Sequence, residues 1–237
     1  MAQYIYGKNS VLQRMNEKKE IDVIYITEGN ELLNTIKKLG YDYKVVNKQK
    51  IDSMSKGNHQ GIVARIPDYK TYTLDEITEN TSDDSVIVML DGIVDPHNLG
   101  AILRTCDAAG AGAVVIGENR NVGLNPTVAK VAVGAIETVK VCPVVNLSQT
   151  IKTLKKRGYW IIGSSLENAV DYREVNYSMP VVLVIGSEGK GLSRLVKENC
   201  DYLIKIPMYG RINSLNASVA TGIMLYQISN TKKPLGR

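Results

Sequence analysis

The chain has 237 residues, of which 44% are hydrophobic and 22% charged, and its formal net charge is +5, which is typical of a globular protein with one large or two modest domains. No apolar run approaches the ~18 residues of a membrane-spanning helix, and the first ten residues lack the apolar stretch of a secretory signal, so we expect a cytoplasmic protein without membrane contact. The three cysteines (Cys106, Cys142 and Cys200) have no C-x-x-C spacing and only two histidines are present, which argues against a disulfide framework and against a metal site.

Residues 1–67 have the pattern of a small α/β domain. They contain 11 Lys and Arg against 7 Asp and Glu, which gives a net charge of +4. Strands are predicted where β-branched and apolar residues cluster, and helices where an apolar period of 3.6 follows a polar cap or ends in glycine. In chain order we expect a strand at 21–26, a helix at 30–39 that ends at Gly40, a strand at 43–46, a short helix at 48–54 and a strand at 61–66.

Residues 68–84 differ from the sequence on either side. They contain one basic residue against six acidic residues and show no sustained hydrophobic period, which is typical of a linker between domains. We therefore predict an N-terminal domain at 1–67, an acidic linker at 68–84 and a second domain at 85–237.

Residues 85–237 alternate short apolar runs with helical patterns, and they carry a net charge of +6. Most of the runs are too continuously apolar for half-exposed strands. Strands that alternate with helices predict a mostly parallel sheet covered on both faces, with ligands held by loops at the carboxyl ends of the strands. We expect strands at 86–90, 113–116, 139–145, 159–164, 181–185 and 202–206, and helices at 99–109, 126–136, 147–157 and 192–199.

The common nucleotide-binding fingerprints are absent from the sequence. Gly186, Gly189 and Gly191 follow an apolar run, but their order fits neither G-x-G-x-x-G nor G-x-x-x-x-G-K-[ST]. A dinucleotide-dependent dehydrogenase and a phosphate-loop NTPase both lose support. Two basic domains are compatible with a nucleic-acid partner, although ordinary solvated lysines give the same net charges.

Three segments place small or polar residues directly after an apolar run: LDGIVDPHNLGAILRTCDAAGA at 90–111, VLVIGSEGKGLS at 182–193 and IPMYGRINSLNASVATGIMLYQ at 206–227. Turn and cap chemistry explains most of these residues singly, with Asn98 as a helix cap, Gly186 at a turn, and Ser214 or Asn216 at the start of the last helix.

Arg104 is harder to explain by turn and cap chemistry. It lies among apolar residues on a helix with little polar surface, where a nearly buried arginine needs a partner. Asp107, one turn further on, is the structural candidate for that partner; a functional site is the other interpretation.

Together and in this order, the three segments resemble the signature motifs of the SpoU/TrmH family of RNA ribose 2′-O-methyltransferases, over almost all of residues 85–237. YGKNSVLQ at 6–13 and HQGIVARI at 59–66 resemble the substrate-binding extension of the branch that methylates a guanosine of 23S ribosomal RNA. The resemblance implies S-adenosylmethionine as cofactor and RNA as substrate. It also implies a SPOUT-type parallel-sheet domain knotted as a trefoil, preceded by a small ribosomal-protein-like α/β domain that binds RNA.

The resemblance further implies a homodimer with active sites near the subunit interface. The last helix carries a wide apolar stripe formed by Val219, Ala220, Ile223, Met224 and Tyr226. This stripe fits a subunit interface, but in a monomer it is simply core.

The resemblance also assigns roles to particular residues. It implies that the backbones of Gly186, Ile206 and Leu215 bind the cofactor and that Ser164 lines its pocket. The implied catalytic residues are Arg104, Asn98 to orient Arg104 or the ribose, Glu188 to fix the loop or to pair with Arg104, and Ser214 and Asn216 from the third segment. A guanidinium is a poor base, so stabilising the developing alkoxide and holding a phosphate suit Arg104 better than proton abstraction.

Other functions stay open at this point. Two alternatives lie within the same family: an enzyme that methylates a transfer RNA, and a resistance methylase that acts on an adenosine of ribosomal RNA. A non-catalytic RNA-binding or ribosome-assembly protein also needs basic domains, but it leaves the three motifs unexplained.

Overall fold

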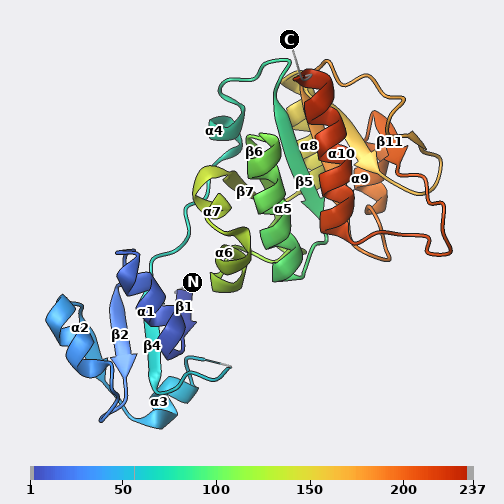
Figure 1. The fold of residues 1–237 in the computed structure, drawn as a ribbon. Helices are drawn as coiled ribbons and strands as arrows, with labels where there is room; N and C mark the ends of the chain where they lie inside the picture. Colours follow the sequence, from blue (N-terminus) through green and yellow to red (C-terminus); the bar gives the residue numbers. More distant parts are fainter. Residues whose placement is uncertain (1–2, 56, 234–237) are drawn as a thin grey trace. The chain divides into compact units, whose positions relative to one another are not determined.

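The computed structural model describes residues 3–55 and 57–233, and the chain divides between Tyr69 and Lys70 into two compact units (Figure 1). The N-terminal unit has a four-stranded sheet in the order β1-β4-β2-β3, in which β4 is antiparallel to β1 and β2. Its strands are β1 (Gln3–Tyr6), β2 (Val23–Ile26), β3 (Tyr43–Val45) and β4 (Ile62–Ile66), and its helices are α1 (Lys8–Asn16), α2 (Leu33–Leu39) and α3 (Lys48–Asp52).

The predicted elements of the N-terminal unit are present, and two more precede them. Gly40 ends α2 in the left-handed region with a φ of 73°, as the sequence predicts. The sequence analysis missed β1 and α1. Strand β1 has only four residues, and α1 starts at Gly7 without a side-chain cap, so neither carries a strong local signal.

The second unit contains a seven-stranded sheet in which every pairing is parallel, which confirms the predicted α/β class. The strand order is β7-β6-β5-β10-β8-β11-β9. The strands are β5 (Val86–Asp91), β6 (Ala113–Gly117), β7 (Lys140–Val144), β8 (Trp160–Ser164), β9 (Val170–Asp171), β10 (Val181–Gly186) and β11 (Tyr202–Lys205).

Helices cover both faces of this sheet. They are α4 (Leu74–Thr78), α5 (Pro96–Ala109), α6 (Pro126–Ala132), α7 (Ala135–Thr138), α8 (Leu147–Lys156), α9 (Arg194–Glu198) and α10 (Ala217–Lys232). In Figure 1, α5 and α10 lie side by side in front of the sheet, and α8 and α9 lie behind it. No described helix has the length and apolar character that crossing a bilayer requires.

The helix predicted at 126–136 is interrupted. Val133 and Gly134 both have positive φ angles, 50° and 92°, and they separate α6 from α7. The left-handed conformation breaks the hydrogen-bond ladder, while the apolar period continues across the break and so hides it from a periodicity analysis.

The acidic segment expected to be a linker is folded onto the second unit from Lys70 onward. It contains α4, which starts with a capping box: the Thr73 hydroxyl accepts a hydrogen bond from Glu76 N, and the Glu76 carboxylate accepts one from Thr73 N at 2.7 Å. Leu74 and Ile77 pack against the core of the second unit. The sequence analysis missed this helix because the acidic and polar residues around it are typical of a linker.

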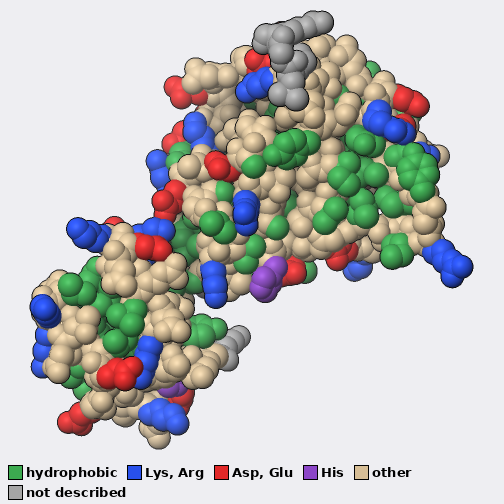
Figure 2. Space-filling view, viewed as in Figure 1, with side chains coloured by type: hydrophobic (Ala, Val, Ile, Leu, Met, Phe, Trp, Pro, Cys, Tyr) green, Lys and Arg blue, Asp and Glu red, His purple; other side chains and the backbone are tan. Residues whose placement is uncertain are grey.

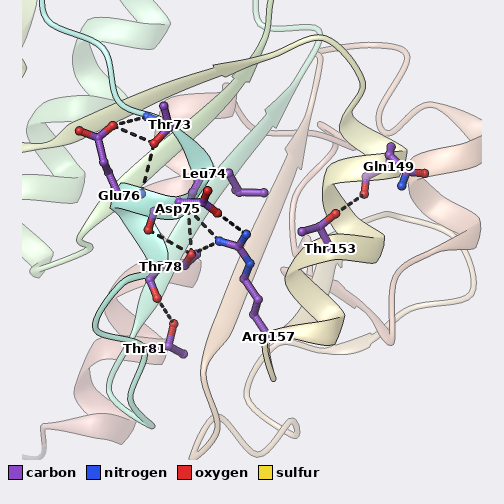
Figure 3. A network of polar contacts seen from close by, with 9 residues as sticks. All are labelled: Thr73, Leu74, Asp75, Glu76, Thr78, Thr81, Gln149, Thr153 and Arg157. Atoms are coloured by element: carbon purple, nitrogen blue, oxygen red, sulfur yellow. Dashed lines mark hydrogen bonds and ion pairs between the residues drawn. The ribbon is translucent and has the colours of Figure 1, made fainter.

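Arg157, the residue after α8, holds α4 in place. Its guanidinium donates to the carbonyl oxygen of Leu74 at 3.2 Å, to the hydroxyl of Thr78 and to the carboxylate of Asp75 (Figure 3). Nearby, Tyr72 N donates to the carbonyl of Val141 in β7. Residues 70–84 are therefore anchored to the second unit by polar contacts as well as by apolar packing.

Replacing Arg157 with alanine is expected to lower the free energy of unfolding by about 1–2 kcal/mol, because the Thr78 hydroxyl loses the guanidinium that donates to it and the Leu74 carbonyl keeps only its other donors, among them the Thr78 hydroxyl. The ion pair itself adds little, since the Asp75 side chain is 86% exposed. Thermal and urea unfolding measure the change. The matched control is Lys156→Ala, an exposed residue beside Arg157 that should shift stability by less than about 0.5 kcal/mol. Equal stability of the two variants would contradict the anchoring role.

Candidate active site

Three separate segments of the second unit meet in one polar cluster. β5 and β10 are adjacent parallel strands whose last residues, Asp91 and Gly186, are paired, so the chain leaves both strands at the same edge of the sheet. Two residues beyond β10, Glu188 Oε1 accepts hydrogen bonds from Asn98 Nδ2 at 3.0 Å and from Asn216 Nδ2 at 2.6 Å. Asn216 Nδ2 also donates to Asn98 Oδ1 at 2.9 Å. We call Asn98, Glu188 and Asn216 the amide–carboxylate cluster.

The helix caps determine which side-chain atoms are free to form this cluster. The expectation that Asn98 caps a helix is wrong: Asp95 is the N-cap of α5 and accepts from His97 N at 2.9 Å. Both ends of the Asn98 amide are therefore used by the cluster. Asn216 serves two roles, because its Oδ1 caps α10 by accepting from Ser218 N at 2.9 Å while its Nδ2 joins the cluster.

Arg104 lies apart from this cluster within the chain. It is exposed rather than nearly buried, and it has no hydrogen bond or ion pair within residues 3–55 and 57–233. The expected pair with Asp107 is absent there, because the Asp107 carboxylate accepts from the Thr138 hydroxyl at 2.6 Å. The alternative pair with Glu188 is also absent from the described contacts. Six residues along α5 separate Arg104 from Asn98, about 9 Å along the axis and on a different face.

A cavity of about 250 Å³ lies beside the amide–carboxylate cluster at the carboxyl ends of β8, β10 and β11. Six of the site residues expected from the sequence line it: Ser164, Gly186, Glu188, Ile206, Ser214 and Leu215. The structure thus brings together the four expected cofactor residues, and it joins Asn98 and Asn216 to the wall of the cavity through Glu188.

Other residues line this cavity without having been predicted as site residues. They are Ser165, Leu166, Lys205, Met208, Asn213, Ala217, Ala220 and Met224, among others. Most lie in or next to the third segment, so their place in that motif was the available signal. Met224 is 3% exposed and belongs to the core rather than to an external apolar stripe.

A tight hairpin after β10 forms one wall of the cavity. Ser187 N donates to the Gly191 carbonyl at 3.2 Å, Gly191 N donates to the Ser187 carbonyl at 2.9 Å, and Gly189 and Gly191 have φ angles of 85° and 63°. The hairpin folds back so closely that a Cβ atom added to Gly186 would lie 2.2 Å from the carbonyl carbon of Gly191. Glycine at position 186 is therefore a steric requirement of this wall.

The cysteines offer no nucleophile at this edge of the sheet. Burial raises the pKa of Cys142 in β7 to about 11 and that of Cys200 to about 12, so both thiols stay protonated at neutral pH. In the part of the chain that the structure describes, no group of three or more His, Cys, Asp or Glu side chains is placed to hold a metal ion.

The motifs that form the site match a known protein family. Residues 85–226 match the family model described as the SpoU rRNA Methylase family. The chain belongs to the SpoU rRNA methylase family. Residues 4–72 match a second model, described as RNA 2′-O ribose methyltransferase substrate binding. Membership of the SpoU family makes the chain an RNA methyltransferase, with the methylase motifs in the second unit and a substrate-binding domain in the first.

Relatives of the SpoU family resemble this chain over most of its length. YacO of Bacillus subtilis (strain 168), named as a TrmH family tRNA/rRNA methyltransferase, is 41% identical over 98% of this chain and 97% of that protein. The crystal structure of an AdoMet-bound rRNA methyltransferase from Sinorhizobium meliloti is 25% identical, with a TM-score of 0.68 over 97% of this chain and 87% of that one. The A. aeolicus TrmH/SpoU tRNA modifying enzyme is 37% identical, with a TM-score of 0.60 over 69% of this chain and 82% of that one.

Proposed function

We propose that this chain transfers a methyl group from S-adenosylmethionine to the 2′-hydroxyl of a ribose in RNA. The observation that carries the proposal is the amide–carboxylate cluster, in which one residue from each of the three motifs meets at the wall of the cavity lined by Gly186, Ile206 and Leu215. A binding protein without catalysis has no need for such a cluster beside a small-molecule cavity.

The cavity has the chemistry that this cofactor requires. Its volume of about 250 Å³ is near the lower limit of ~300 Å³ for small-molecule sites. Ile185, Ile206 and Met208 offer apolar surface to an adenine ring, and the carboxylate of Glu188 supplies a negative charge that favours a sulfonium cation. The dinucleotide cofactor of a dehydrogenase is disfavoured, because the segments that line this cavity contain no G-x-G-x-x-G loop at the start of a helix to bind the pyrophosphate.

Methyl transfer by in-line displacement depends on positioning the ribose oxygen opposite the sulfur of the methyl donor, and different residues of the chain contribute to this positioning. The cofactor supplies an activated methyl group. Asn98 and Asn216 fix Glu188 through Oε1, while Oε2 has no hydrogen bond within the described residues and is left to accept one from the substrate. Arg104 grips a substrate phosphate and stabilises the developing alkoxide, since a guanidinium stays protonated. Ser214 adds a hydroxyl at the cavity wall.

We further propose a homodimer in which α5 and α10 form the interface. Val219 and Tyr226 on α10 are 50% and 46% exposed, and Arg104 on the neighbouring α5 is exposed without a partner in the described residues. Figure 2 shows hydrophobic side chains gathered on the face where α10 lies. A second copy on this face would cover the apolar side chains and bring Arg104 toward a site. The trefoil knot implied by the motifs also stays a prediction.

For the substrate we propose a guanosine of 23S ribosomal RNA, which places the enzyme in the cytoplasm. The S. meliloti rRNA methyltransferase aligns with 97% of this chain, whereas the A. aeolicus tRNA modifying enzyme aligns with 69%. The match of residues 4–72 to a substrate-binding model supports a role of the N-terminal unit in selecting the RNA. The second candidate is a transfer RNA, because YacO is named for both substrates.

Calorimetry and methyl mapping test this function. The full chain is expected to bind S-adenosylmethionine or its demethylated product but not NADH or ATP. With labelled cofactor it should methylate ribosomal RNA at one ribose, and mapping of 2′-O-methyl groups in cells with and without the gene should show the same site. Tight NADH binding without a response to S-adenosylmethionine would overturn the function. Label found only in transfer RNA would replace the ribosomal substrate with the second candidate.

A further inference from the structure

A second cavity lies at the same edge of the sheet as the cofactor cavity. Its volume is about 600 Å³, and the residues that line it lie at or after the ends of β5, β6 and β7 and at the starts of α8 and α9. The cofactor cavity instead lies at the ends of β10, β8 and β11. In the strand order, the second cavity therefore lies on the β7-β6-β5 side of the sheet and the cofactor cavity on the β10-β8-β11 side. Residues 185–189 and 191 line the first cavity and residues 193–196 line the second, so the segment after β10 contributes to both.

The second cavity is cationic. Arg120 lines it and has no hydrogen bond or ion pair within the described ranges 3–55 and 57–233. Arg194 also lines it; its ion pair with Glu198 at 2.7 Å is exposed on both sides and contributes at most ~1 kcal/mol, so Arg194 can exchange this partner at little cost. The one carboxylate in the lining belongs to Asp91, which is 4% exposed and already accepts a hydrogen bond from Ser193 N at 2.6 Å.

Polar and apolar groups accompany the two arginines. Asn119 and Ser148 add an amide and a hydroxyl to the lining. Val145 and Leu195 also line the cavity and are 74% and 52% exposed, which leaves apolar surface open to solvent. Guanidinium groups bind phosphate oxygens in a planar, bidentate manner, and flat nucleobases pack on apolar surface while amides read their edges. This combination fits a nucleotide better than it fits a small inorganic anion.

We propose that this cavity binds a nucleotide of the substrate RNA next to the methylated one, with Arg120 and Arg194 on its phosphodiester. The inference rests on the proposed function, because it takes RNA as the substrate. The two cavities adjoin, because the paired last residues of β10 and β5 line them, Gly186 the first and Asp91 the second. A ribose at the amide–carboxylate cluster and a nucleotide at the arginines therefore belong to neighbouring positions of one strand. The second cavity then holds the strand while the first holds the methyl donor.

The test is the double variant Arg120→Ala/Arg194→Ala in the full chain, with ribosomal RNA fragments as the probe. Removing two phosphate contacts should raise the KM for RNA by about 10-fold or more with kcat near that of the parent protein. It should also reduce the slope of log affinity against log salt by about 1.4, at ~0.7 for each contact to a single strand. The affinity for S-adenosylmethionine should not change. Lys156→Ala, which removes a positive charge at the far end of α8, is the matched control and should leave all three quantities unchanged.

The outcomes separate a failure of the cavity proposal from a failure of the proposed function. Unchanged RNA affinity and an unchanged salt slope in the double variant, with an active parent, would overturn the cavity as an RNA site. A changed oligomeric state without a change in RNA affinity would also overturn it, since the arginines would then serve contact between copies. A parent that neither binds S-adenosylmethionine nor methylates RNA would instead overturn the proposed function. Because both arginines are exposed, the single variant Arg120→Ala gives the same readouts if the double variant unfolds.

Discussion

Replacing Arg104 with alanine is expected to lower the rate of methyl transfer by at least ~100-fold, the loss typical of a positioned charge in an active site. The side chain is exposed and has no hydrogen bond or ion pair in the described part of the chain, so its removal leaves no buried group unsatisfied. The free energy of unfolding of the folded subunit should therefore stay within about 0.5 kcal/mol of the parent value.

Single-turnover methyl transfer at saturating cofactor and RNA measures this effect. Arg104→Lys should also fail, because an ammonium group cannot reproduce the planar fork of a guanidinium on a phosphate. Lys130→Ala, which removes an exposed charge on the neighbouring helix α6, is the matched control and should retain the parent rate. Near-normal turnover of a folded Arg104→Ala protein would contradict the assigned role.

Replacing Gly186 with alanine is expected to weaken binding of S-adenosylmethionine by at least ~100-fold, about 2.7 kcal/mol. The new Cβ would lie 2.2 Å from the carbonyl carbon of Gly191 and 2.5 Å from the backbone nitrogen of Leu192, so backbone atoms must move. The hairpin that moves carries Glu188, which lines the cavity and holds the amide–carboxylate cluster together. The single methyl group therefore deforms the cofactor wall and the cluster at once.

Calorimetry with the cofactor measures the loss of affinity, and urea unfolding reports the stability separately. Gly112→Ala is the matched control, because a Cβ atom at that position meets nothing within 4 Å and its φ angle is not in the left-handed region. That variant should bind the cofactor as the parent does. A Gly186→Ala protein with parent affinity would show that the hairpin does not form the cofactor wall.

The class of fold was predictable because the signals for it are local. Continuous apolar runs that alternate with helical periods specify a parallel sheet, and Gly40 follows the last apolar residue of its helix, where a left-handed glycine commonly ends a helix. Strand β9 escaped because two residues show no period, and α4 escaped because it lies in an acidic, polar stretch typical of a linker.

The geometry of the candidate site was not predictable from local signals. Asn98, Glu188 and Asn216 are 90 and 28 residues apart along the chain, and they meet because β10 pairs with β5, which no periodicity specifies. The resemblance of the three segments to family motifs pointed to these residues, but only the order of the strands in the sheet brings them together. Arg104 was expected to be nearly buried because its neighbours in the sequence are apolar. That inference failed because α5 leaves this face uncovered in the single chain.

The double role of Asn216 limits which amino acids that position tolerates. Its oxygen caps α10, and its nitrogen donates to Asn98 and Glu188. Aspartate is an equally good cap, but it would place a second carboxylate where the amide now lies 2.6 Å from Glu188, and like charges at that distance repel. Serine caps the helix, but it has no second polar group to donate to Asn98 and Glu188. Of these three good capping residues only asparagine meets both demands, so one side chain links the stability of α10 to the integrity of the amide–carboxylate cluster.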